Sequence, residues 1–173
     1  RQAAAGAAWG EEHSSNFGNP LVGPCQTIGR AELAAAVQVI KIEKRRLLLR
    51  VDNAWVVDGL QLILRGEIPG PLWEHADLWE VAWRAIKARE KPVRVVKVEG
   101  HLDDEAVAQG KGTKDEAIGN DHADTWAKSG VDAHPPADEH ERILRSQKQW
   151  ALRTHMMMLE IVLARAEKFR ELG

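Results

Sequence analysis

The sequence predicts an α/β domain with parallel strands, followed by a long helical tail. Three observations predict this class. Short apolar runs alternate with segments whose apolar residues recur at helical spacing. Breaks rich in Gly and Pro separate these segments. From residue 137 to residue 172 neither Gly nor Pro interrupts the chain. Because strands that alternate with helices are typical of parallel sheets, we expect a central sheet flanked by helices.

The first half of the chain predicts five elements in order. Residues 6–9 form a short apolar strand, and residues 11–24 have the Ser, Asn, Gly and Pro content of a turn-rich connection. A helix follows over about 30–42. Residues 47–51 are almost continuously apolar, which favours a central strand covered on both faces. A second helix is expected over 54–64.

The second half predicts a helix over 77–89 and a strand over 93–98. Residues 102–119 are acidic and contain Gly, which indicates a mobile loop, and a last core helix runs from 120 to about 129. We therefore expect a core domain at 1–132. The remaining segment, 133–173, is expected to be a linker and an amphipathic helix, broken at most once, which could dock on neighbouring domains.

Composition bounds the class of protein. The 173 residues, 44% of them apolar, suffice for one globular domain with an appendage. The single cysteine, Cys25, excludes an internal disulfide and favours a reducing intracellular compartment, cytoplasm or nucleus. No run reaches the ~18 apolar residues of a membrane span, so no membrane partner is expected. The net charge of −2 offers no overall attraction to nucleic acid, so such binding would need local basic groups or metal ions.

Four polar residues stand where chemistry is often placed, and each also has a simpler explanation. Asp52 follows an apolar strand, at the edge where open α/β sheets bind ligands, but it could equally cap the next helix. Glu32, expected in a first helical turn behind a Gly29 N-cap, could serve only capping and the helix dipole. The same holds for Asp124, four residues after an expected Asn120 cap, and His101 could be a solvated loop histidine.

Their joint arrangement is more specific than any single residue. Gly29-Arg30-Ala31-Glu32-Leu33 precedes Val51-Asp52-Asn53 by one helix and one strand. Val98-Glu99-Gly100-His101 ends a later strand, and Asn120-Asp121-His122-Ala123-Asp124 opens the last core helix. This order resembles the ribonuclease H family, with its Arg-Ala-Glu-Leu helix start, strand-end Asp, Gly-His segment and Asn-x-x-x-Asp helix. The resemblance spans roughly residues 6–129, and it implies a ribonuclease H-like fold with a mixed central sheet.

The resemblance also implies a chemistry. Glu32, Asp52 and Asp124 would be catalytic carboxylates that hold two Mg²⁺ ions, with Mn²⁺ as a substitute, because hard cations prefer oxygen ligands. His101 would assist proton movement or product release as a further catalytic residue. The substrate would be an RNA–DNA hybrid, contacted by Arg30, Asn53 and Asn120, whose RNA strand is hydrolysed.

The chain also departs from the family pattern. Residues 6–10 resemble the family's second strand, so we expect the first strand and its catalytic Asp to lie before Arg1, and an impaired chain without them. Gly29 replaces the usual Asn, and the helices near 64 and 77 have no basic insertion between them. These features resemble the ribonuclease H domains of reverse-transcribing mobile elements. Two alternatives stay open: a non-catalytic scaffold or nucleic-acid-binding module, and an exonuclease or integrase-like enzyme of the same superfold.

Overall fold

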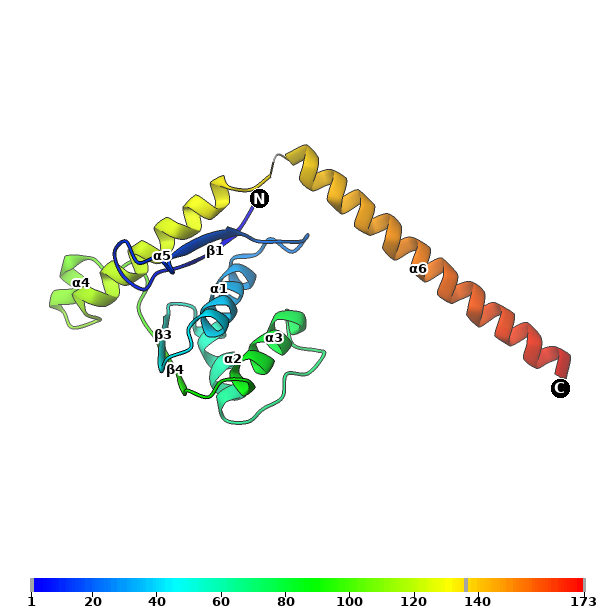
Figure 1. Cartoon of the computed structure of the whole chain (residues 1–173), viewed down its shortest axis with the longest axis horizontal. Coiled ribbons are helices and arrows are strands. Elements are labelled where there is room, and N and C mark those ends of the chain that lie inside the picture. The colour runs from blue at the N-terminus through cyan, green and yellow to red at the C-terminus, as the bar shows by residue number, and fades with distance from the viewer. Residues whose placement is uncertain (1, 136, 173) are drawn as a thin grey trace. The chain divides into compact units, whose positions relative to one another are not determined.

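A computed structural model describes residues 2–135 and 137–172, with side chains given for 2–135 and 141–170. The chain divides into two compact units, Arg1–His134 and Pro135–Gly173, which are described separately. The first unit contains nine elements (Figure 1). They are β1 (Ala4–Ala7), β2 (Phe17–Pro20), α1 (Ile28–Ile42), β3 (Leu47–Val51), α2 (Ala54–Leu64), α3 (Ala76–Lys87), β4 (Val93–Lys97), α4 (Asp104–Ala108) and α5 (Lys114–Asp132). The second unit contains α6 (Ala137–Leu172).

The strands form two separate pairs. β1 is antiparallel to β2, with Ala4 opposite Pro20 and Ala7 opposite Phe17. β3 is parallel to β4, in a register that runs from Leu47–Val93 to Val51–Lys97. The predicted parallel pairing is confirmed, but the expected single mixed sheet is not found. Over the described residues, the strands join into two two-stranded sheets, and neither β1 nor β3 has a partner on its second edge.

The prediction of an irregular connection over residues 11–24 was wrong, because β2 lies within it. Gly18 and Pro20 disfavour a strand locally, but tertiary contacts override that preference. A Cβ on Gly18 would stand 1.8 Å from the Trp126 carbonyl oxygen, so only glycine lets β2 pack this closely on α5. Pro20 is tolerated because β2 is an edge strand. The first strand also begins and ends two residues before the predicted range of 6–9.

The start of α1 corrects two further predictions. Its N-cap is Thr27, whose hydroxyl accepts a hydrogen bond from the Arg30 N–H at 3.2 Å. Gly29, the predicted cap, has no side-chain acceptor and lies inside the helix. Glu32 consequently falls beyond the first turn, where capping and the helix dipole no longer account for it. Its carboxylate contacts another part of the chain, as described below.

The segment 102–119, predicted to be a mobile loop, contains α4 and the beginning of α5. Thr113 and Glu116 form a reciprocal capping box at the start of α5. Asn120 is therefore not an N-cap, as predicted, but lies within the helix. The helix starts six residues earlier than expected because a cap with two reciprocal hydrogen bonds stabilises the start of a helix more than a lone Asn.

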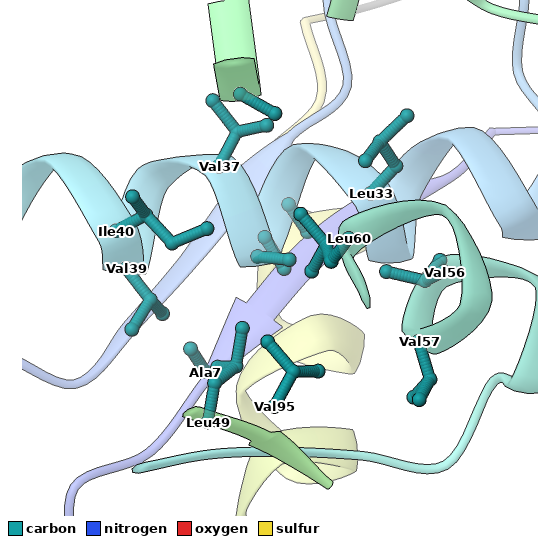
Figure 2. Close-up of a cluster of buried hydrophobic side chains, with 14 of the residues drawn as sticks. Ala7, Leu33, Val37, Val39, Ile40, Leu49, Val56, Val57, Leu60 and Val95 are labelled. Atoms are coloured by element: carbon teal, nitrogen blue, oxygen red, sulfur yellow. The ribbon is translucent and has the colours of Figure 1, made fainter. Parts of the chain in front are cut away.

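The core of the first unit gathers around α1. Figure 2 shows side chains from β1, β3, β4 and α2 packed against this helix. Leu33, Val56 and Leu60 are completely buried. Trp79 of α3 also packs into the core, where a Cβ on Gly59 would approach its ring to 2.3 Å. The close approach of α3 to α2 therefore depends on glycine at position 59.

The second unit is one unbroken helix. α6 has 36 residues, which corresponds to about 54 Å at 1.5 Å per residue. Its large apolar side chains are exposed, among them Trp150, Met157, Leu159 and Leu163. In the described parts of the chain no helix combines the length and apolar character that crossing a membrane requires.

Candidate active site

Five of the predicted site residues line one pocket of about 820 Å³ in the first unit. They come from four different segments: Glu32 from α1, Asp52 after β3, His101 from the loop after β4, and Asn120 and Asp124 from α5. The pocket is bounded mainly by α1, α5 and the unpaired edges of β1 and β3. Residues up to 92 positions apart therefore converge on one hollow.

Glu32 is the most perturbed acid in the pocket. Burial raises the pKa of its carboxyl group, and the nearby carboxylates of Asp52 and Asp124 raise it further. The side-chain amide of Asn53 donates a hydrogen bond to Glu32 and opposes this rise in pKa. Like charges and burial both disfavour ionisation, so this corner of the pocket carries an unneutralised negative potential. Such a potential is the usual condition for attracting a cation.

Asp52 stands at the carboxyl end of β3, beside the turn that follows β4. A Cβ added to Gly100 would lie 3.1 Å from an Asp52 carboxylate oxygen, so glycine allows this turn to approach the acid closely. His101 follows with a φ of 53°, a left-handed conformation that is uncommon outside glycine. Its side chain is 85% exposed, and its Nδ1 lies 3.7 Å from an Asp124 oxygen. The histidine thus stands at the rim of the pocket, next to a carboxylate.

Asn120 and Asp124 share one face of α5 because they are four residues apart. Their common face explains why both line the pocket although neither is near the helix start. Two acids that the sequence analysis missed, Asp115 and Glu116, line the same pocket one turn earlier. The signal for them was the Thr113-x-x-Glu116 capping box, which moves the helix start to include them.

Arg30 and Asn53 have structural contacts that the sequence did not predict. The Arg30 guanidinium forms a two-pronged ion pair with Asp77, at 2.8 and 2.5 Å, that joins the starts of α1 and α3. Asn53 caps α2 by accepting from the Trp55 N–H at 2.9 Å, while its amide group donates to Glu32. Neither residue lines the pocket. Their predicted contacts with substrate stay predictions.

The donor set of the pocket suits a hard divalent cation, because carboxylate oxygens are the ligands such ions prefer. The electrostatic interaction of Glu32 with Asp52 and Asp124 places the three acids near one another. Among the described residues, however, no three acidic, His or Cys side chains are close enough to form a ready-made metal site. Holding an ion with these acids would require side-chain movement or another ligand.

The comparison with protein families decides what kind of pocket this is. The RNase H family model matches residues 1–132, about three quarters of the chain. The chain belongs to the RNase H family. Membership suggests ribonuclease activity on RNA–DNA hybrids and a hydrolase that uses divalent metal ions. A search of curated proteins found no matching relative. In this RNase H domain, Glu32, Asp52, His101, Asn120 and Asp124 are therefore the residues to test for catalysis.

Proposed function

We propose that this RNase H domain is a metal-dependent endonuclease that hydrolyses the RNA strand of RNA–DNA hybrids. The observation that carries the proposal is the shared pocket of Glu32, Asp52 and Asp124, with His101 at its rim. Membership of the family supplies the substrate class. We further propose Mg²⁺ as the physiological ion, with Mn²⁺ as a substitute.

The three carboxylates would hold the divalent ions. When bound, two such ions activate water and stabilise the leaving oxygen in phosphodiester hydrolysis. The amide of Asn53 restrains the Glu32 carboxylate through its hydrogen bond. His101, exposed beside Asp124, can accept or release a proton at Nδ1. Asn120 presents its amide one turn away from Asp124 and is placed to contact the sugar-phosphate backbone.

We expect this chain to cleave slowly. The described acids do not form a ready-made metal site, and the negative pocket repels phosphate until cations bind. We also propose that the domain derives from a retroelement, whose neighbouring domains would supply substrate affinity. The exposed apolar side chains of α6 would dock on such a domain. Deleting residues 137–173 should then leave the melting temperature of the core unchanged while weakening that association.

A second candidate function is a non-catalytic nucleic-acid-binding scaffold. The lack of a three-ligand group among the described side chains favours it. The two candidates differ in metal dependence, because a scaffold needs no ion to bind a hybrid.

The test compares Asp52→Asn with Asp58→Asn, which neutralises an exposed acid on α2 outside the pocket. Mn²⁺ binding is measured by titration calorimetry, and cleavage is followed on an end-labelled RNA annealed to DNA. We expect wild type and Asp58→Asn to bind Mn²⁺ weakly and to cleave the RNA strand slowly, and Asp52→Asn to lose both. Equal Mn²⁺ binding by wild type and Asp52→Asn would refute the metal assignment. Hybrid binding without any Mn²⁺ binding or cleavage would favour the scaffold.

A further inference from the structure

The part of the pocket away from the carboxylates forms a groove between two strand edges. β1 lines one side and β3 lines the other, over residues 3–9 and 47–51. Each strand already pairs on its far edge, with β2 or β4, and the described residues provide no partner for the near edges. Alternate residues along each near edge therefore direct N–H and C=O groups into the groove. Unpaired backbone groups on both walls identify the ligand chemistry as an extended polypeptide.

The two walls run in opposite directions. β1 runs along α1: the Ala3 N–H donates to Gln26 just before the helix, at 2.9 Å, and the Trp9 indole N–H donates to Glu43 at its end, at 3.2 Å. β3 runs the other way, because it starts shortly after Glu43 and leads to Asn53, which donates to Glu32 near the helix start. A strand in the groove must therefore be antiparallel to one wall and parallel to the other.

The floor and roof of the groove are built from small residues. α1 contributes Ala31, Ala35 and Ala36, and α5 contributes Gly119, Ala123 and Ala127. Residues 119, 123 and 127 share one helix face. Small side chains on both helices leave room for larger apolar side chains on an incoming strand. A strand covered on both faces in this way would be apolar on both faces.

The size of the groove fits one strand. Five residues at ~3.3 Å each, with ~4.8 Å between strands and ~10 Å between packed layers, fill about 800 Å³. The pocket volume is about 820 Å³. The outer edge of β2 is a poorer place for strand addition, since Pro20 lacks an N–H and Gly18 has no side chain to pack.

We propose that the groove takes an apolar β-strand of about five residues from outside residues 1–173, joined by a short turn ahead of β1. Such a strand lies antiparallel to β1, since an antiparallel neighbour needs only a short turn, and it is consequently parallel to β3. Its insertion joins the two pairs into one continuous mixed sheet. This inference does not depend on catalysis, since it concerns the sheet edges and not the acids.

The test fuses Thr-Val-Thr-Val-Thr-Val and a Gly-Ser-Gly-Ser linker to the N-terminus of the full chain. The matched control replaces the central Val of this added strand with Pro, which removes an N–H and prevents regular pairing. Hydrogen exchange measured by mass spectrometry reports on Ala4–Ala7 and Leu47–Val51 separately. We expect at least tenfold slower exchange in both segments for the fused strand, and little change for the Pro control.

Three outcomes would overturn the proposal. The first is unchanged exchange in both segments. The second is equal slowing by the Pro control, which would indicate a nonspecific effect of the added residues. The third is slowing in Ala4–Ala7 alone, which would mean that the strand pairs with β1 outside the groove. Light scattering of the unfused chain adds a check, because concentration-dependent dimers with protected edges would show that a second copy fills the groove.

Discussion

Arg89 is the residue whose removal should most clearly uncouple α1 from β3. Its guanidinium donates to the carbonyl oxygens of Ile40 at 2.8 Å, Arg45 at 2.6 Å, and Glu43. A fourth, weaker contact reaches the Lys91 carbonyl at 3.3 Å. One side chain thus satisfies carbonyls at the end of α1 and in the turn that leads into β3. These groups otherwise have few partners, since a helix leaves its last carbonyls unpaired.

Arg89→Ala should destabilise the domain by about 2–4 kcal/mol, taking three good hydrogen bonds at roughly 0.5–1.5 kcal/mol each. With a urea m-value of about 2 kcal/mol/M, the midpoint of unfolding would fall by about 1–2 M. Arg89→Lys should recover less than half, because one ammonium cannot reach all the carbonyls. Arg84→Ala is the matched control. Arg84 forms an exposed i,i+4 pair with Glu80 at 2.6 Å, so its loss should cost at most about 0.5 kcal/mol. Equal midpoints for Arg89→Ala and Arg84→Ala would refute the reasoning.

Three further predictions follow from packing, charge and capping. Gly18→Ala should cost about 3 kcal/mol or more in thermal melts, because its Cβ would collide with the Trp126 carbonyl, whereas Gly119→Ala, in open space on α5, should be neutral or stabilising. Because the folded-state pKa of Glu32 is raised, its ionisation lowers stability as pH rises through that pKa. Glu32→Gln should therefore be more stable than wild type at neutral pH, and urea melts should show the difference vanish below pH 4.5; a constant difference would contradict it. Thr113→Ala should cost about 1 kcal/mol, seen as a lower urea midpoint, by removing the cap of α5.

Elements defined by local periodicity could be predicted from the sequence. The strand at 47–51 and the helices at 54–64 and 137–172 have the predicted bounds. In the helix at 54–64, Val56, Leu60 and Ile63 recur at helical spacing and are buried. The burial of β3 is only partly as predicted, since Leu48 is 48% exposed and one face is left open.

Elements set by tertiary contacts could not be predicted. β2 exists because β1 pairs with it and α5 covers it, and Gly18 permits that cover. Nothing in the local pattern of Phe17–Pro20 signals this, because Gly, Asn and Pro are typical of turns. The division into two strand pairs was also invisible, since strand spacing along a sequence does not report which edges meet.

The acids of the pocket show why a wrong helix start still gave a useful residue. Asp124 lines the pocket whether α5 begins at residue 114 or 120, because the helical period fixes its face relative to Asn120. The earlier start adds Glu116, whose environment is opposite to that of Glu32. The Thr113 backbone N–H lowers the pKa of Glu116, and Arg50, 3.7 Å away, lowers it further. Glu116 is therefore stabilised as an anion without a cation, whereas Glu32 beside Asp52 and Asp124 is not. A divalent ion gains most where ionised acids lack partners, so it should favour the Glu32 side of the pocket.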